Sequence, residues 1–251
     1  MNRPLPTLPA VRGIFVTGTD TEVGKSVIAA GLTATLRARG VQAVYFKAVQ
    51  SGCPEEDGRL IATDARLAQT MAGLAEPLSL LTPVTLQLPL APAVAAAQAN
   101  VRIDLEVIAQ AYRNLAGRYE FMVVEGAGGL YVPLIDTTFL VLDLARWLNL
   151  PVLVVARPGL GTINHTVMTV KTVEQAGLPV VGVVLNQYPE QPNLAARTNP
   201  QVIAALTGRP ILARVPVIPH LTTAAGTAAL IAALQPVVDS AAWQEFYGER
   251  E

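Results

Sequence analysis

Residues 13–32 read GIFVTGTDTEVGKSVIAAGL, and this stretch decides the fold. A short apolar run ends at Gly18, a polar loop follows as far as Gly24-Lys25-Ser26, and the sequence then becomes rich in alanine. Strand, glycine-bounded loop and helix in this order are typical of a phosphate-binding loop, because glycines let backbone N–H groups face an anion and the helix N-terminus adds partial positive charge. We expect Lys25 to reach the β- and γ-phosphates of a nucleotide and the Ser26 hydroxyl to bind Mg²⁺.

The spacing of this loop departs from the usual pattern. Four residues normally stand between the first glycine and the Gly-Lys pair, whereas five separate Gly18 from Gly24. An ordinary strand-to-helix turn that binds no ligand is therefore an alternative. The agreement of strand, loop and helix around the two glycines favours the phosphate-binding interpretation.

Further apolar runs predict more strands. They are rich in β-branched residues and lack period-two alternation, which indicates strands that are covered on both faces. Together with Gly13–Thr17, the predicted strands are Ala43–Phe46, Phe121–Val124, Val152–Val155, Val180–Leu185 and Ile211–Val215.

Stretches with helical spacing occupy most of the intervals between these runs. The predicted helices are Ser26–Arg39, Asp64–Met71, Asp104–Leu115, Thr138–Leu148, Ile163–Ala176 and Pro200–Leu206. Asp104 is the expected N-cap of its helix, and Asn199 with Pro200 is expected to form a cap and first-turn pair. Alternating strands and helices predict a three-layer α/β fold, in which a mostly parallel central sheet carries helices on both faces.

The chain of 251 residues is expected to form a single domain over residues 13–238. Residues 1–12 contain three prolines and are expected to be a flexible tail. Residues 239–251 are expected to form a C-terminal helix or tail. The segment Val49–Leu88 is less regular, and we expect one helix and a long loop there.

The composition excludes several classes of protein. Apolar residues make up 51% and charged residues 15%, which argues against disorder. A net charge of −1 gives no reason to expect nucleic acid or an anionic membrane as a partner. The most apolar region, Leu130–Ala156, contains charged residues and Pro151, so a membrane span is not expected.

The single cysteine, Cys53, makes an intrachain disulfide impossible and favours a cytoplasmic protein. Cys53 as a catalytic nucleophile is an alternative. The only histidines available as its base are His165 and His220, and neither lies near it in the sequence.

Two charged residues follow predicted strands, where ligands bind in a parallel sheet. Lys47 follows the second strand and would neutralise negative charge, although spacing alone favours an ordinary surface lysine. Glu125 ends the third strand, directly before Gly126-Ala127-Gly128-Gly129, in the position where nucleotide-binding proteins place a metal-directed carboxylate. Asp64 by itself indicates only a favourable charge at a helix N-terminus.

The loop Gly18-Thr19-Asp20-Thr21-Glu22-Val23-Gly24-Lys25 resembles the signature loop of dethiobiotin synthetases, which share its additional residue. The resemblance extends from about Gly13 to Pro219 and includes the sequence Glu-Gly-Ala-Gly-Gly that begins at Glu125. It implies a P-loop NTPase-like fold and a homodimer that uses ATP and Mg²⁺. The implied reaction adds CO2 to 7,8-diaminononanoate and closes a ureido ring, giving dethiobiotin, ADP and phosphate.

The resemblance also implies roles for individual residues. The expected catalytic residues are Lys25, Lys47 and Thr21. The expected nucleotide contacts are Gly18, Thr19, Asp20, Glu22, Val23, Gly24, Lys25, Ser26, Asn186, Pro216 and Val217. The expected substrate contacts are Thr21, Lys47, Ser51, Gly128, Gly161, Thr162 and Asn164, of which the last three belong to a segment that reaches the partner subunit's substrate. The expected metal ligands are Ser26, Asp64 and Glu125.

The sequence departs from the better-known members of this family in two places. Arg157-Pro158-Gly159 replaces a shorter stretch, which leaves the local geometry open. In Pro89-Leu90-Ala91-Pro92, Ala91 takes the place of a serine that lines the family's substrate tunnel, so a hydroxyl contact is lost. For His165, a structural role near a helix start is favoured over catalysis.

Two alternatives from other classes remain. A partition or positioning ATPase would share this fold, but those proteins carry an additional lysine near the start of the loop, where this chain has Thr19-Asp20-Thr21. They also commonly end in a basic amphipathic segment, whereas residues 222–251 contain Arg250 as their single basic residue. An amidating ligase of the cobyrinate type would need a glutaminase domain with a cysteine nucleophile, for which the sequence leaves no room.

Overall fold

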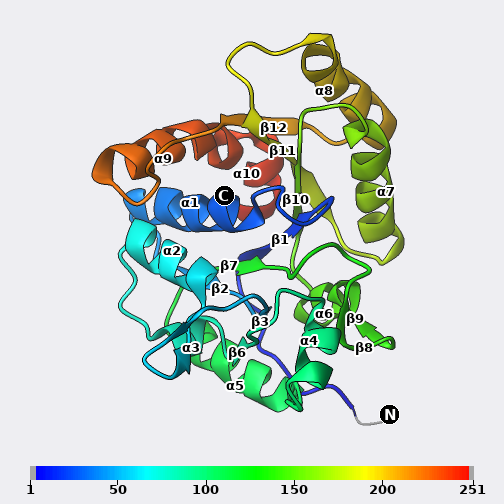
Figure 1. The fold of residues 1–251 in the computed structure, drawn as a ribbon. Helices are drawn as coiled ribbons and strands as arrows, with labels where there is room; N and C mark the ends of the chain where they lie inside the picture. Colours follow the sequence, from blue (N-terminus) through cyan, green and yellow to red (C-terminus); the bar gives the residue numbers. More distant parts are fainter. Residues whose placement is uncertain (1–3, 249–251) are drawn as a thin grey trace.

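The computed structural model describes residues 4–248 and has a six-stranded parallel sheet at its centre (Figure 1). The strand order is β12-β11-β10-β1-β7-β2. The strands are β1 (Gly13–Gly18), β2 (Ala43–Phe46), β7 (Phe121–Glu125), β10 (Val152–Ala156), β11 (Val180–Tyr188) and β12 (Ile211–Pro216). All six predicted strands are therefore confirmed, as is the mostly parallel sheet.

The central strand β1 is buried throughout because it lies between β7 and β10. Every residue of β2, β7 and β10 is buried as well, which explains why these strands read as continuous apolar runs. The carboxyl ends of parallel strands meet at one edge of the sheet. This geometry brings the residues that follow β1, β2 and β7 together.

Helices cover both faces of the sheet. On one side lie α1 (Lys25–Ala38), α9 (Ala224–Asp239) and α10 (Ala241–Tyr247) (Figure 1). On the other side lie α6 (Val141–Leu148), α7 (Thr162–Gln175) and α8 (Leu194–Thr207). Helix α5 (Leu105–Ala116) packs against β7. Its predicted cap is confirmed, since the Asp104 carboxylate accepts a hydrogen bond from the Glu106 N–H at 2.9 Å.

The predicted start of α8 is wrong. The helix begins at Leu194, and its N-cap is Asn193, whose side chain accepts a hydrogen bond from the Ala196 N–H. Pro200 consequently lies inside the helix. The Asn199 side chain, which the sequence suggested as a cap, donates instead to the carbonyls of Pro158 and Gly159 at 2.9 and 3.1 Å. This long-range contact ties α8 to the loop after β10, and local sequence rules do not reveal it.

The start of α6 also differs from the prediction. Residues Phe139–Leu140 form a short strand, β9, which pairs with β8 (Pro133–Asp136), so the helix begins at Val141 rather than at Thr138. The Asp143 carboxylate accepts a hydrogen bond from the Leu140 N–H at 2.8 Å. The polar residues before Val141 thus belong to a turn, in which the Asp136 carboxylate accepts from the Thr138 N–H.

The irregular middle of the chain contains more structure than the sequence predicted. Its expected helix is α2 (Thr63–Ala72), and the additional helices are α3 (Leu78–Leu81) and α4 (Pro92–Gln98). The short strands in this region are β3 (Val49–Gln50), β4 (Glu55–Glu56), β5 (Arg59–Leu60) and β6 (Val84–Thr85). They pair as β3 with β6 and β4 with β5. Strands of two residues are too short to show a periodic pattern.

Both ends of the described chain contact the domain. The Trp147 indole donates to the Pro6 carbonyl at 2.8 Å, and the Arg113 guanidinium donates to the Thr7 carbonyl at 2.9 Å. The expected C-terminal segment forms α10 as far as Tyr247, and its buried Trp243 stacks on Phe121 with ring centroids 5.6 Å apart. Residues 1–3 and 249–251 lie outside the described part.

Within residues 4–248, no single helix has the length and apolar character needed to cross a membrane. Helices α9 and α10 satisfy these criteria only as a pair, and the chain bends by 72° between them.

Candidate active site

The loop between β1 and α1 is held open by glycine and by a buried asparagine. Gly24 has φ +88°, a left-handed conformation that favours glycine. Asn186, at the carboxyl end of β11, donates from its amide nitrogen to the Val23 carbonyl at 2.9 Å. A Cβ atom on Gly24 would lie 2.0 Å from that nitrogen. The glycine therefore serves both the backbone turn and the close approach of Asn186.

The Lys25 side chain lies along the inside of this loop. Its ammonium group donates to the Asp20 carbonyl at 2.8 Å, and the residue is only 6% exposed. Burial lowers the pKa of Lys25 below its ordinary value, although the Glu125 carboxylate acts in the opposite direction. This contact places a cation inside the loop, where a triphosphate-binding loop requires positive charge.

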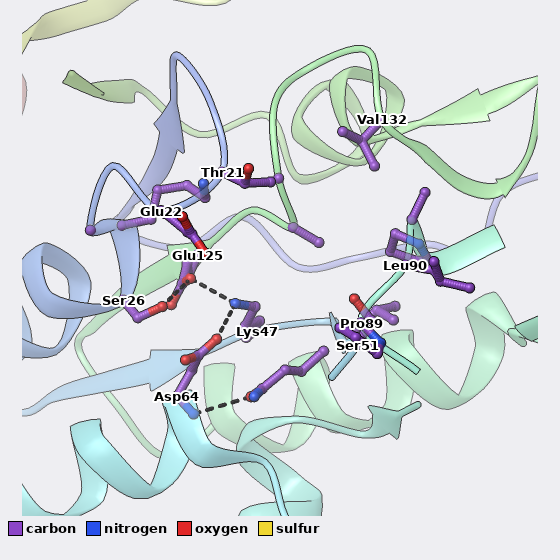
Figure 2. Close-up of a pocket in the computed structure, with 18 residues that line it drawn as sticks. Thr21, Glu22, Ser26, Lys47, Ser51, Asp64, Pro89, Leu90, Glu125 and Val132 are labelled. Atoms are coloured by element: carbon purple, nitrogen blue, oxygen red, sulfur yellow. Dashed lines mark hydrogen bonds and ion pairs between the residues drawn. The ribbon is translucent and has the colours of Figure 1, made fainter. Parts of the chain in front are cut away.

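A buried charged cluster lies beside the loop (Figure 2). Glu125, at the end of β7, accepts hydrogen bonds from the Ser26 hydroxyl at 2.8 Å and the Lys47 ammonium at 2.7 Å. The Lys47 ammonium also pairs with the Asp64 carboxylate, from the first turn of α2. Lys47 thus lies between two carboxylates that are distant in sequence.

Lys47 is 6% exposed, so it is not the surface lysine that spacing alone favoured. Burial by itself would lower the pKa of Lys47, but the Glu125 and Asp64 carboxylates raise it above its ordinary value. Lys47 is therefore a fixed positive charge in a dry environment, where it acts strongly on any anion that approaches.

Two residues that the sequence did not single out complete the cluster. The Tyr45 hydroxyl donates to Glu125 Oε2 at 2.6 Å, and burial, followed by the Glu125 charge, raises the pKa of Tyr45 well above its ordinary value. Gln50 donates to the Thr63 hydroxyl at 2.7 Å and accepts from the Asp64 N–H at 3.2 Å, which positions the start of α2. The sequence gives no signal for either role, because Tyr45 reads as a core strand residue and Gln50 as a loop residue.

The loop and the cluster share one cavity of about 580 Å³. Its polar lining includes the predicted site residues Thr21, Glu22, Gly24, Lys25, Ser26, Lys47, Ser51, Asp64, Glu125 and Gly128. Its apolar wall includes Pro89, Leu90, Ala91, Pro92 and Val132. Figure 2 shows Leu90 and Val132 at the end of the cavity away from Ser26 and Asp64. The cavity therefore offers charge at one end and an apolar surface at the other.

Other predicted site residues lie outside this cavity. Gly161, Thr162 and Asn164 lie at the start of α7, where Asn164 is exposed and the Thr162 hydroxyl is 3.3 Å from that of Thr166. Pro216 and Val217 lie at the end of β12, next to β11, and Val217 is exposed. The structure thus brings Lys25, the predicted metal ligands and the predicted carbamate residues to one cavity, separate from the α7 group. Four other predicted nucleotide contacts belong to the same loop but do not line this cavity: Gly18, Thr19, Asp20 and Val23.

The oxygen donors of the cluster are suited to Mg²⁺. The Ser26 hydroxyl and a Glu125 carboxylate oxygen are 2.8 Å apart, and the Asp64 carboxylate faces the same Lys47 ammonium. Over residues 4–248, no group of three or more His, Cys, Asp or Glu side chains gathers as a metal site. Two carboxylates and one hydroxyl are what Mg²⁺ uses when water and substrate phosphates supply its other ligands. These residues therefore fit the predicted ion.

The structure argues against a reactive cysteine. Cys53 is buried, and its thiol donates to the Gln50 carbonyl at 3.4 Å. Burial raises the pKa of this thiol above its ordinary value, which disfavours the nucleophilic thiolate. His165 is exposed on α7 and does not line the cavity.

Arg157, which belongs to the stretch that departs from the family, contacts the phosphate-binding loop. Its guanidinium donates to the Thr21 carbonyl at 2.9 Å and lies 3.5 Å from the Asp20 carboxylate. Because the ion pair is exposed, its contribution is small, and the hydrogen bond contributes about 1 kcal/mol. The Arg157→Ala variant is therefore expected to raise the KM for ATP about 5-fold without changing kcat, as steady-state kinetics would show.

Arg113→Ala is the matched control for this prediction. Arg113 likewise donates to one carbonyl, that of Thr7, and pairs with one carboxylate, that of Glu106, on a helix remote from the loop. Its removal is expected to leave the KM for ATP unchanged. An equal rise of the KM for ATP in Arg157→Ala and Arg113→Ala would show that the effect at Arg157 is not specific to the loop.

Comparison with known proteins agrees with this geometry. A family model described as "AAA domain" matches residues 12–225. The chain is 41% identical over 207 residues to an ATP-dependent dethiobiotin synthetase from Clostridium novyi, covering 81% of this chain and 87% of the relative. It is 46% identical over 205 residues to one from Anaeromyxobacter sp. strain Fw109-5, covering 81% and 89%.

Among solved structures, the MinC:MinD cell division protein complex of Aquifex aeolicus contains a chain with the same fold. The TM-score is 0.54, the sequence identity is 14%, and the match covers 96% of this chain and 98% of that chain. At this identity the likeness concerns the fold alone. The identities to the dethiobiotin synthetases are much higher and extend over most of both chains, so this chain belongs to the dethiobiotin synthetase family of P-loop enzymes.

Proposed function

We propose that the protein closes the ureido ring of dethiobiotin on 7,8-diaminononanoate, using CO2 and ATP. The observation that carries this proposal is the single cavity that joins Lys25 and Lys47 to the apolar wall at Leu90 and Val132. The charged end is suited to a triphosphate and a carbamate, and the apolar end to an aliphatic chain. The named activity of the relatives supports the same conclusion.

The reaction proceeds in three steps. One amine of the diamine adds to CO2, releases a proton and becomes a carbamate. A carbamate oxygen attacks the γ-phosphorus of ATP, the bond to the bridging oxygen breaks, and ADP leaves with the electron pair. The second amine then attacks the carbonyl carbon of the carbamic–phosphoric anhydride, phosphate leaves, and loss of a proton completes the ring.

The protein contributes alignment and charge rather than covalent chemistry. We assign Lys25 to the β- and γ-phosphates and Lys47, with Ser51, to the carbamate and the phosphoryl group that it receives. Thr21 and Gly128 line the same cavity and are assigned to the substrate. Ser26, Asp64 and Glu125 would hold Mg²⁺, which neutralises phosphate charge when bound.

We assign the adenine base to the carboxyl ends of β11 and β12. Asn186 lies there and contacts the phosphate-binding loop through Val23, and Pro216 and Val217 lie at the end of the adjacent strand. The Asn186 amide nitrogen donates one of its two N–H groups to the Val23 carbonyl, so we assign its oxygen and its second N–H group to the base. The remaining loop residues Gly18, Thr19, Asp20, Glu22, Val23 and Gly24 are assigned to the phosphates.

We further propose a homodimer in which Gly161, Thr162 and Asn164 bind the substrate tail of the partner subunit. Gly161 and Asn164 are exposed at the start of α7, which supports this, because the N–H groups of a helix start attract an anion such as a carboxylate. Exposed apolar side chains near this segment include Leu160, just before α7, and Met168 on α7, and Leu194 is exposed on the neighbouring helix α8. Light scattering is expected to give twice the mass of 26.5 kDa, and a monomer at all concentrations would refute the dimer.

The function is tested by following ADP release and product mass together. We expect ATP turnover to require both the diamine and bicarbonate, and the product to carry one carbonyl carbon from labelled bicarbonate. ATP hydrolysis that needs neither compound and responds instead to DNA or lipid would favour the positioning ATPase. The corresponding test in cells uses a strain that lacks its own dethiobiotin synthetase: this protein should let it grow without added biotin. We propose that the protein is located in the cytoplasm.

A further inference from the structure

The buried hydroxyl of Tyr45 is an unusual feature of this sheet. Tyr45 lies in β2, opposite Val123 of β7 in the parallel register, and is 0% exposed. Glu125 follows two residues after Val123 and therefore points to the same face of the sheet. The Tyr45 hydroxyl donates to Glu125 Oε2 at 2.6 Å, within the usual range for a hydrogen bond to a charged acceptor.

The two oxygens of Glu125 have different partners. Oε1 faces the cavity and accepts from the Ser26 hydroxyl and the Lys47 ammonium. Oε2 is turned toward the core, where it accepts from Tyr45. Since Glu125 is 1% exposed, water does not readily replace the phenol as a donor. A buried carboxylate oxygen that loses its donor is strongly disfavoured, so the side chain would turn toward the remaining donors.

We propose that Tyr45 is a positioning residue for Glu125: its hydroxyl holds Oε2 so that Oε1 is presented to the ion and phosphates bound in the cavity. Residues that orient a metal ligand through such hydrogen bonds typically contribute 10- to 100-fold to metal affinity or activity. The inference rests on the proposed function through the assignment of Glu125 to Mg²⁺. Tyr45 itself does not line the cavity.

Tyr45→Phe tests the proposal because it removes one oxygen and keeps the ring. Calorimetry of ADP binding is expected to show about 10-fold weaker binding in the presence of Mg²⁺ and unchanged binding in the presence of EDTA. In steady-state assays, kcat should fall about 10-fold and the Mg²⁺ concentration for half-maximal rate should rise, while the KM for the diamine stays constant.

Tyr112→Phe is the matched control. Tyr112 is 1% exposed and packs edge-on against Phe46, the neighbour of Tyr45 in β2, with ring centroids 5.7 Å apart. Within residues 4–248, its hydroxyl has no hydrogen-bond partner. Its removal is expected to change neither ADP binding nor kcat. The two variants lose the same atom from equally buried rings, so a difference between them reports on Glu125.

Either of two binding results would overturn the proposal, as would one structural result. One is wild-type binding of ADP with Mg²⁺ in Tyr45→Phe; the other is an equal loss with and without Mg²⁺, which indicates general damage to the site. A crystal structure of Tyr45→Phe with ADP and Mg²⁺ that shows Glu125 unmoved would also refute it. The ADP-binding measurements and the crystal structure do not use the diamine, so they stand even if the protein makes a product other than dethiobiotin.

Discussion

Replacing Lys47 with alanine is expected to lower kcat about 10³-fold. The ammonium is a fixed charge in a buried site, and removing one such group from a reacting oxyanion typically costs 10²- to 10³-fold. The loss should appear in kcat more than in the KM for ATP, because we assign the nucleotide mainly to the loop after β1. Rapid-quench measurement of ADP formation would separate the phosphorylation step from ring closure.

The same variant is expected to remain folded but less stable. Removal of Lys47 leaves Asp64 and the 1%-exposed Glu125 without their shared cation, and breaking a buried pair costs about 3 kcal/mol. Glu125 keeps its hydrogen bonds from Ser26 and Tyr45, which limits the damage. Thermal unfolding followed by circular dichroism would measure the change, and Mg²⁺ with ADP should restore part of the stability.

Lys171→Ala serves as the control for Lys47. Lys171 also pairs with a carboxylate, that of Glu174, but this pair lies on the surface of α7. Its loss is expected to change stability by less than about 1 kcal/mol and to leave kcat unaltered. Activity above one tenth of wild type in Lys47→Ala would contradict the role assigned to Lys47.

Gly24→Ala is expected to weaken ATP binding about 100-fold. A left-handed backbone costs a residue with a Cβ atom about 1–2 kcal/mol, and φ at Gly24 is +88°. The new Cβ would also lie 2.0 Å from the Asn186 amide nitrogen, so the hydrogen bond from Asn186 to the Val23 carbonyl is lost. With about 1 kcal/mol for that bond, the sum of about 3 kcal/mol corresponds to two powers of ten.

Gly40→Ala separates the effect of backbone strain from the effect of displacing Asn186. Gly40 has nearly the same φ, +83°, but a Cβ atom there meets nothing within 4 Å. This variant is expected to lose about 1 kcal/mol of stability and to bind ATP normally. Fluorescence titration with a labelled ADP compares the two proteins directly. Normal nucleotide binding by Gly24→Ala would mean that the loop tolerates displacement of Asn186.

The sheet could be predicted because its signal is local. Each central strand is covered on both faces, so its residues are apolar in succession. The glycine-bounded loop from Gly18 to Gly24 predicts the helix that follows it. The start of α8 was predicted wrongly because a distant partner decides it: Asn199 contacts the loop after β10, and α8 takes Asn193 as its cap. The start of α6 was predicted wrongly because a short hairpin with β8 takes residues that the helix would otherwise include.

In the candidate site, too, some features follow from the sequence and others only from the tertiary structure. By itself the sequence determined the parallel α/β fold, the phosphate-binding loop and, through resemblance, the residues around it, since these depend on neighbours along the chain. Only the tertiary structure decided that Lys47 is buried between Asp64 and Glu125, that Tyr45 turns its hydroxyl to Glu125, and that Arg157 reaches Thr21. Burial and hydrogen bonding of a side chain are set by elements that pack together from distant parts of the chain, and no local pattern encodes them.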